Sequence, residues 1–124
     1  MMIVIQCKGF QLTPALREHV RRRLGFSLAR ANSHISRVDV SLSDINGPRG
    51  GIDKRCLVKV RLEGLQLVVV DDVQSNLYSA IDRAAGRAGR IVLRRLARQS
   101  DKRRIAATQK MQRWLPSLSN QSAL

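Results

Sequence analysis

A strict alternation of apolar and polar side chains over residues 54–63 restricts the fold of this chain more than any other feature. The apolar residues would share one face of a strand: Cys56, Val58, Val60 and Leu62. The residues pointing the other way include three basic ones: Arg55, Lys59 and Arg61. Such a strand is buried on one face only. We therefore expect a sheet with one face packed on a core and the other face in water.

Three other segments have the signature of a strand. Residues 2–8 and 35–43 alternate in the same way, and residues 67–70 form a short, mostly β-branched run. Gly64 marks a tight turn before the last of them, and residues 46–51 have the composition of a flexible loop. The chain thus supplies four strands.

Helical periodicity begins after the first strand. Thr13 and Pro14 are typical of the cap and the first turn of a helix. The apolar residues that follow recur every four positions and mark its buried stripe: Leu16, Val20 and Leu24. Asn32 and Ser33 interrupt this pattern.

A second helix is predicted at about residues 73–98. Asp71 and Asp72 precede it and would suit its cap and the positive end of its dipole. Its apolar positions follow a helical period: Leu77, Ile81, Ala84, Ala88, Ile91 and Leu96. Gly86 and Gly89 each cost about 1 kcal/mol relative to alanine, but the periodicity crosses both without slipping.

The predicted order β-α-β-β-β-α corresponds to an α+β fold. Its economical packing is a four-stranded sheet with both helices on one face. The first helix would cross over between two parallel strands, and the others would form antiparallel hairpins. Of the 124 residues, we assign residues 1–98 to this domain. Residues 99–124 would form a basic, partly disordered tail with room for a short helix at 105–114 and disorder from residue 116 onward.

The charge of the chain is strongly positive and uneven. Lys and Arg number 23 against 9 Asp and Glu, for a formal net charge of +14. Residues 83–113 alone contain 11 cations and one anion, Asp101. Such an excess favours a polyanionic partner, because each exposed cation can displace a counterion from a phosphate chain.

Five arginines of the second helix, which we call the arginine ladder, recur at intervals of three and four residues: Arg83, Arg87, Arg90, Arg94 and Arg98. At about 100° per residue they fall within a sector of about 80° beside the apolar stripe. Their axial spacing of about 4.5–6 Å is comparable with that of phosphates, which arginine can bind in a bidentate way. No acid occurs between Asp82 and Asp101, whereas a merely solvated face normally mixes both signs.

The first helix adds four cations that form either a second wall of the same site or an ordinary solvated face: Arg17, Arg21, Arg22 and Arg23. The aromatic residues are few: Phe10, Phe26, Tyr78 and Trp114. Proteins that stack single-stranded bases on a sheet need more rings, and no zinc-finger or helix-turn-helix pattern is present. These features favour recognition of structured RNA by its backbone and shape.

The residues give little support to an enzyme or to a metal or cofactor site. His19 and His34 lack a metal-ligand spacing with Cys7 and Cys56, which we expect to be reduced core residues. No apolar run approaches the roughly 20 residues of a membrane span, and no secretory signal is present. We expect a cytoplasmic, non-enzymatic protein without metal, cofactor, membrane partner or small-molecule substrate.

Two segments resemble a known family, the ribosome hibernation-promoting factors, also called ribosome-associated inhibitor or sigma-54 modulation proteins. Residues 13–20, TPALREHV, are similar to the family's T-x-A-L-R-E-x-V. Residues 76–82, NLYSAID, are similar to its D-[LM]-Y-x-A-I-D, and basic positions follow them. The similarity extends over roughly residues 1–98.

The resemblance implies a fold like that of double-stranded-RNA-binding domains and a role in ribosome hibernation. Such a protein would bind rRNA of the small ribosomal subunit, compete with mRNA, tRNA and initiation factors, and block translation in stationary phase or stress. By family match, five arginines would contact rRNA: Arg17, Arg23, Arg87, Arg90 and Arg94. Tyr78 and Asp82 also match family positions, with packing and helix-start chemistry as their expected roles.

The sequence departs from the family pattern in three places. Asn76 replaces the usual acid, and Phe26 stands where some members have a basic residue. Residues 99–124 are too few for the ribosome-pairing domain of long-form members, so we expect a short form. Two other functions stay open: a general RNA chaperone or ribosome-assembly factor with the same basic faces, and modulation of a transcription factor, which no residue supports directly.

Overall fold

The structure is a computed structural model that describes residues 1–45 and 53–114, with elements in the predicted order and one added 3-10 helix. The strands are β1 (Met2–Lys8), β2 (Ile35–Asp44), β3 (Lys54–Leu62) and β4 (Val68–Gln74). The helices are α1 (Pro14–Ser27), the 3-10 helix η1 (Ala29–His34) and α2 (Leu77–Trp114). The expected loop at 46–51 and the expected disorder from residue 116 lie outside the described residues.

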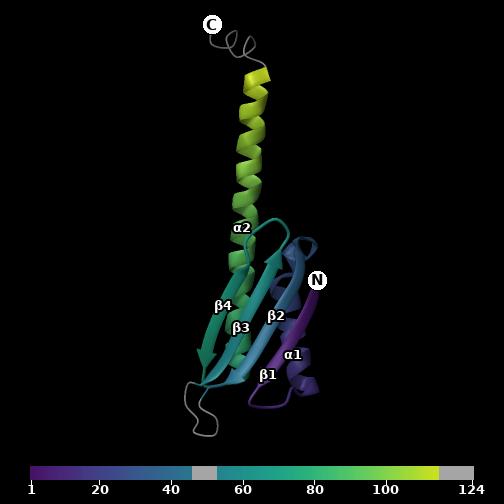
Figure 1. Cartoon of the computed structure of the whole chain (residues 1–124), viewed down its shortest axis with the longest axis vertical. Coiled ribbons are helices and arrows are strands. Elements are labelled where there is room, and N and C mark those ends of the chain that lie inside the picture. Colours follow the sequence, from purple (N-terminus) through teal and green to yellow (C-terminus); the bar gives the residue numbers. More distant parts are fainter. Residues whose placement is uncertain (46–52, 115–124) are drawn as a thin grey trace. The chain divides into compact units, whose positions relative to one another are not determined.

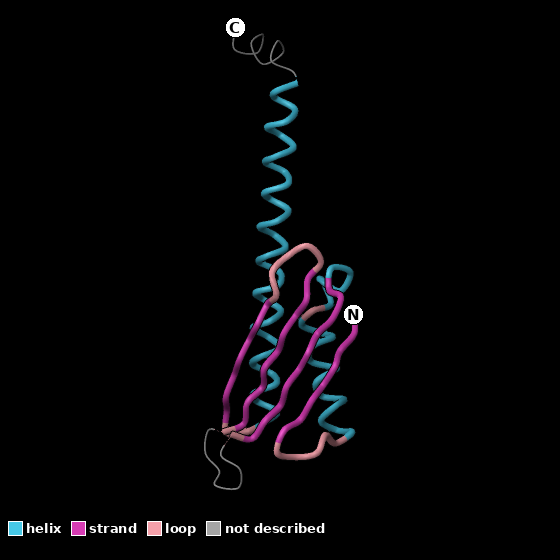
Figure 2. The backbone as a smooth tube through the Cα atoms, viewed as in Figure 1, coloured by secondary structure: helices cyan, strands magenta, loops and turns pink. Residues whose placement is uncertain are grey.

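The four strands form one sheet in the order β1-β2-β3-β4. β1 runs parallel to β2, with α1 in the crossover between them, and β2, β3 and β4 are antiparallel neighbours. Residues 1–93 form one compact unit, in which α1 and the first part of α2 cover the same face of the sheet (Figure 1, Figure 2). The predicted α+β architecture is confirmed.

The register of the sheet places apolar residues on the face that the helices cover. Val40 of β2 lies between Ile5 of β1 and Val58 of β3, and Val70 of β4 continues this row. The largest fully buried side chains come from this face and from the helices: Leu24, Leu28, Leu42, Ile81, Val20, Val38, Val40, Val58, Val60, Val68, Val70 and Val92. Burying each such side chain stabilises the fold by about 1.5–3 kcal/mol.

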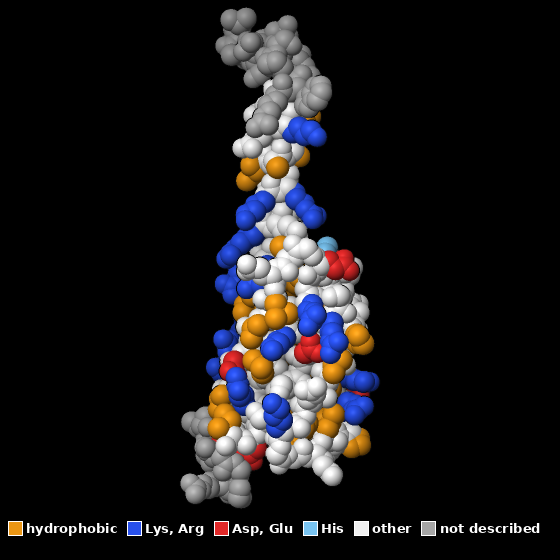
Figure 3. Space-filling model, viewed as in Figure 1, with side chains coloured by type: hydrophobic (Ala, Val, Ile, Leu, Met, Phe, Trp, Pro, Cys, Tyr) orange, Lys and Arg blue, Asp and Glu red, His pale blue; other side chains and the backbone are white. Residues whose placement is uncertain are grey.

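The opposite face of the sheet carries charged side chains, as the alternation predicts. Lys59 lies beside Asp39 in the register, and Arg61 lies beside Arg37. The Asp39 carboxylate lies 2.7 Å from Arg37 and 3.9 Å from Arg61. Figure 3 shows this side of the molecule, where Lys and Arg side chains lie among hydrophobic ones.

Local chemistry fixes both ends of α1. The Thr13 Oγ1 accepts a hydrogen bond from the Leu16 backbone N–H at 3.1 Å, which confirms the predicted cap. At the other end the Leu28 N–H donates to the Leu24 carbonyl at 2.9 Å, and the chain then tightens into η1. The predicted interruption at residues 32–33 falls inside η1.

The prediction that Asp71 and Asp72 cap the last helix is wrong. Both residues belong to β4, where they pair in register with β3. The Arg55 guanidinium donates two hydrogen bonds to Asp71, at 2.8 and 2.7 Å, and thereby lowers the pKa of this carboxyl. The cap of α2 is Asn76, whose Oδ1 accepts a hydrogen bond from the Tyr78 N–H at 2.8 Å. Cross-strand pairing therefore overrides the capping preference of the two aspartates.

α2 is longer than the sequence pattern indicated. It continues through residues 99–114, where the sequence contains neither Gly nor Pro and is rich in residues that favour a helix. The expected end near residue 98 is therefore wrong, whereas residues 105–114 are helical as expected but belong to α2 and not to a separate helix. Residues 94–124 form a second unit, in which the side chains of residues 100–112 are exposed.

The buried stripe of α2 differs from the predicted one in detail. Leu77, Ile91 and Leu96 are only half-buried. The fully buried apolar residues of this helix are mostly alanines: Ala80, Ile81, Ala84, Ala85, Ala88 and Val92. Small side chains on this stripe allow the helix to lie close to its neighbours.

The two cysteines are free thiols in different surroundings. Burial, reinforced by the nearby Asp72 and Asp71 carboxylates, raises the pKa of Cys56 to about 12, whereas Cys7 is only half-buried. Because the thiolate is the reactive form, we expect a thiol reagent at mildly alkaline pH to modify native Cys7 well before Cys56. In denaturant both thiols should react at similar rates. Mass spectrometry of the labelled peptides checks this order, and equally fast labelling of both native thiols would contradict it.

Candidate nucleic-acid interface

Three arginines of the ladder lie on the part of α2 within the compact unit. Arg83, Arg87 and Arg90 are all exposed. The Asp72 Oδ2 lies 3.6 Å from the Arg83 Nε and 3.3 Å from the Arg87 Nη1. Arg87 also donates a hydrogen bond to the backbone oxygen of Asp71 at 3.1 Å. β4 therefore positions two of the three guanidinium groups.

The lack of acids between Asp82 and Asp101 indicated that nothing compensates the positive charge of the arginine ladder. The position of Asp72 shows that this expectation is wrong. Between Asp82 and Asp101 the helix contains no acid, but Asp72 on the inner face of β4 lies beside it. The Asp72 side chain is 6% exposed, whereas those of Arg83 and Arg87 are 64% and 45% exposed. One carboxylate shared by two guanidinium groups leaves one positive charge in excess, and each group has five donors. Asp72 therefore orients the pair without cancelling its charge.

Arg90 lies beside the crossing of α1 and α2. It is exposed and has no ion-pair partner among the residues that the structure describes. A Cβ placed on Gly86 would lie 3.5 Å from the Arg90 Nη1. A Cβ on the buried Gly89 would lie 2.6 Å from the Ser27 carbonyl oxygen of α1. The close helix contact at Gly89 thus fixes the backbone from which Arg90 projects.

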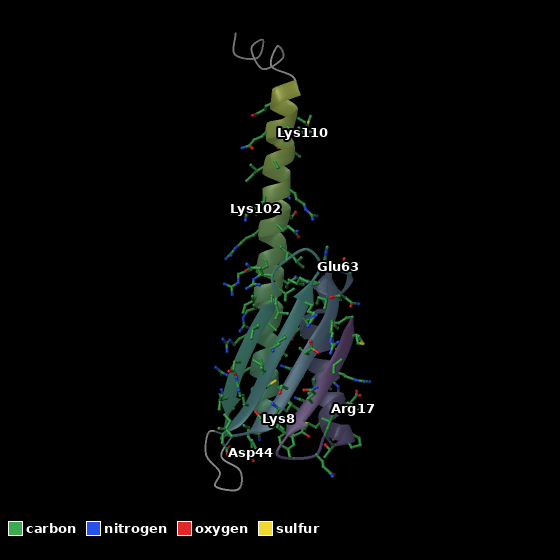
Figure 4. All side chains as sticks on the ribbon, viewed as in Figure 1. Lys8, Arg17, Asp44, Glu63, Lys102 and Lys110 are labelled. Carbon is green, nitrogen blue, oxygen red and sulfur yellow. The ribbon has the colours of Figure 1, made fainter. Side chains whose placement is uncertain are left out.

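The other two ladder arginines, Arg94 and Arg98, belong to the second unit. Both are exposed, and neither has an ion-pair partner within residues 1–45 and 53–114. Figure 4 shows Lys102 and Lys110 projecting from the same part of α2. Asp101 is the one acid of residues 94–112, so this unit is strongly basic in its own right.

The four cations of α1 do not form one group. Arg17 and Arg21 are exposed and, with Glu18, line a shallow hollow at the start of the helix. Arg22 is exposed and lies 3.7 Å from Glu18. Arg23 is half-buried, and its Nε lies 3.0 Å from a carboxylate of α2. Of the four, Arg23 is the one for which the structure shows a contact with α2.

Comparison with known proteins identifies the family. The family model for sigma 54 modulation protein / S30EA ribosomal protein matches residues 3–104. The chain belongs to this family. The family predicted from the sequence is thereby confirmed, and membership of it makes the protein a ribosome-associated protein.

Two solved structures are similar to this S30EA-family chain. A ribosomal subunit interface protein from Coxiella burnetii is 19% identical, with a TM-score of 0.64 over 78% of this chain and 99% of that chain. The Protein Y N-terminal domain from Thermus thermophilus is 29% identical, with a TM-score of 0.60 over 74% of this chain and 93% of that chain. A search of curated proteins found no match. The two structures show that the fold is shared over most of the chain.

The two segments that resemble the S30EA family meet at a contact between α1 and α2. The His19 Nε2 is hydrogen-bonded to the Asp82 Oδ1 at 2.7 Å, and the Arg23 Nε lies 3.0 Å from the same oxygen. The Tyr78 ring packs edge-on against His19, with 4.7 Å between ring centroids. Tyr78 and Asp82 therefore pack the helices together, whereas Asn76 caps α2. The contact of His19 with Asp82 was not predicted from the sequence, because the two residues are 63 positions apart.

Neither a metal cluster nor a membrane span occurs in residues 1–45 and 53–114. No group of three or more His, Cys, Asp or Glu side chains there could hold a metal ion. No helix of that part is long and apolar enough to cross a membrane. Within the same residues, the arginines of α1 and α2 are the candidate functional groups.

Proposed function

We propose that this protein is a ribosome hibernation factor that binds rRNA of the small ribosomal subunit and blocks the channel for mRNA and tRNA. It would act in the cytoplasm during stationary phase or stress, in competition with mRNA, tRNA and initiation factors. Membership of the S30EA family supports the ribosome as its partner. The observation that carries the proposal is the exposure of Arg83, Arg87 and Arg90 with one buried acid shared between two of them.

The exposed arginines have the chemistry that rRNA phosphates require. A guanidinium group is planar, always charged and able to bind two phosphate oxygens at once. The contacts of Asp72 with Arg83 and Arg87 are 3.6 and 3.3 Å long, whereas strong charge-assisted hydrogen bonds measure about 2.7–2.9 Å. Phosphate can therefore bind the remaining donors without displacing a tight internal pair.

The cations of α1 and of the second unit extend the proposed contact. Arg17, Arg21 and Arg22 are exposed and would bind phosphates directly. Arg23 would bind phosphate and would also help to hold α1 against α2, because its Nε lies beside the Asp82 carboxylate of α2. Residues 1–98 would form the ribosome-binding domain, with Arg94 and Arg98 at its end, and residues 99–124 would add a basic tail.

Co-sedimentation with separated ribosomal subunits tests this function. We expect saturable binding to the small subunit with one protein per particle, and displacement by tRNA or initiation factors. Chemical footprinting should then protect small-subunit rRNA along the mRNA and tRNA channel. Binding to many unrelated RNAs with similar affinity, together with RNA annealing, would instead indicate a chaperone.

Binding should weaken steeply with salt. If about six phosphates are neutralised, each releases a counterion, so affinity should fall about a thousandfold between roughly 50 and 200 mM monovalent salt. Filter binding or co-sedimentation across a salt series measures the slope. A nearly flat titration would contradict binding through arginine and phosphate.

A further inference from the structure

The most exposed large hydrophobic side chain of the described residues is Phe26, which is 82% exposed. It lies in the last turns of α1, off the buried stripe that contains Leu24. The one close ring pair in residues 1–45 and 53–114 joins His19 to Tyr78, so both faces of the Phe26 ring are free of other rings. Leaving a phenyl ring in water forgoes its burial free energy. A single exposed ring is common on a protein surface, so the charged residues around Phe26 are what indicate a partner.

Arginines lie one helical turn before Phe26 and in the 3-10 helix after it. Arg22 and Arg23 precede it by one helical turn, and Arg30 follows it by four residues in η1. The next residue, Ser27, contacts α2 at Gly89, beside the exposed Arg90. An apolar ring is thus set among cations that would already attract phosphates.

We propose that Phe26 is a stacking platform for an unpaired base of the bound RNA, next to phosphates held by the surrounding arginines. This rests on the proposed function, because rRNA is the RNA to be bound. A nucleotide matches both parts of the surface, since its base offers a π-face to the ring and its phosphate offers oxygens to the guanidinium groups. An apolar peptide would cover the ring but leave the arginines without counter-charges. Recognition would then combine backbone contacts with one stacked base.

Substitutions at Phe26 separate stacking from plain apolar contact. F26A removes the ring, F26L keeps an apolar side chain without a π-face, and F26W keeps the π-face. Loss of one stacked base corresponds to a drop in affinity of about five- to a hundredfold. We expect this drop for F26A and F26L on isolated small ribosomal subunits, whereas F26W should bind like the unmodified protein.

Two controls accompany these variants. V69A removes a side chain that is 51% exposed on the opposite, outer face of the sheet, and should leave binding unchanged. The salt dependence of binding should be the same for F26A as for the unmodified protein, because no phosphate contact is removed. Because Phe26 is so exposed, thermal unfolding should show F26A to be folded.

Two results would overturn the stacking role. One is F26L binding as tightly as the unmodified protein, which would indicate apolar contact with a protein surface. The other is F26A without any loss of affinity while substitution of the ladder arginines does abolish binding, which would leave the proposed function intact. If the ladder variants also bound normally, the proposed function itself would fail.

Discussion

Replacing Arg87, Arg90 and Arg94 together with alanine should abolish most of the binding to small ribosomal subunits. Each lost phosphate contact weakens binding and removes about one unit from the salt slope, so we expect a loss of about a hundredfold or more and a slope smaller by about three. The protein should stay folded, because all three side chains are exposed, alanine favours a helix, and the buried Asp72 keeps Arg83 and Gln74 as partners. Co-sedimentation measures the affinity, and a cell-free translation assay measures the inhibition.

A second triple variant with the same change in net charge controls for general electrostatic attraction. Lys8, Lys59 and Arg61 lie on the outer face of the sheet, which the helices do not cover. Their replacement by alanine should leave most of the binding and inhibition in place. Equal losses in both variants would mean that net charge alone drives association, and undiminished inhibition by the ladder variant would refute the proposed function.

The strands and their order could be predicted because alternation directly reports which face of a strand is buried. The parallel pairing of β1 with β2 followed from the helical crossover, and the antiparallel pairing of the others followed from short connections. The boundary between β4 and α2 could not be predicted in the same way. Asp71 and Asp72 have the local signature of a cap, but Arg55 holds Asp71 across the strand pair. At this boundary, the local preference of the aspartates for a helix cap is outweighed by a contact between residues 16 positions apart.

The candidate site shows the same division between local and distant information. The spacing of the ladder identified exposed arginines, because a helical period places them on one side of α2. Asp72 beside Arg83 and Arg87 was invisible to the sequence, since it reaches them from another element. The contact of His19 and Arg23 with Asp82 was hidden for the same reason. Sequence periodicity thus locates the charges but not the acids that orient them.

Replacing Gly89 with alanine should destabilise the fold strongly. Its Cβ would lie 2.6 Å from the Ser27 carbonyl oxygen and 3.2 Å from the Ser27 carbonyl carbon, both of which are backbone atoms that cannot rotate away. α1 and α2 would have to separate, and such overpacking costs about 1–3 kcal/mol or more, beyond the gain in helix propensity of about 1 kcal/mol. Urea unfolding should show a lower midpoint, and Arg90 should lose its fixed position beside the crossing.

The same substitution at Gly86, one turn earlier, is a matched control with the opposite expected sign. The atom nearest to its Cβ would be the Arg90 Nη1 at 3.5 Å, the far end of a flexible side chain at an ordinary contact distance. The variant should therefore gain up to about 1 kcal/mol from helix propensity. Because both substitutions make the same chemical change in the same helix, a difference in their unfolding midpoints isolates the contact between α1 and α2. Equal shifts for both variants would show that Gly89 is not needed for the close approach of the helices. They would also show that α1 and α2 can lie farther apart without a loss of stability.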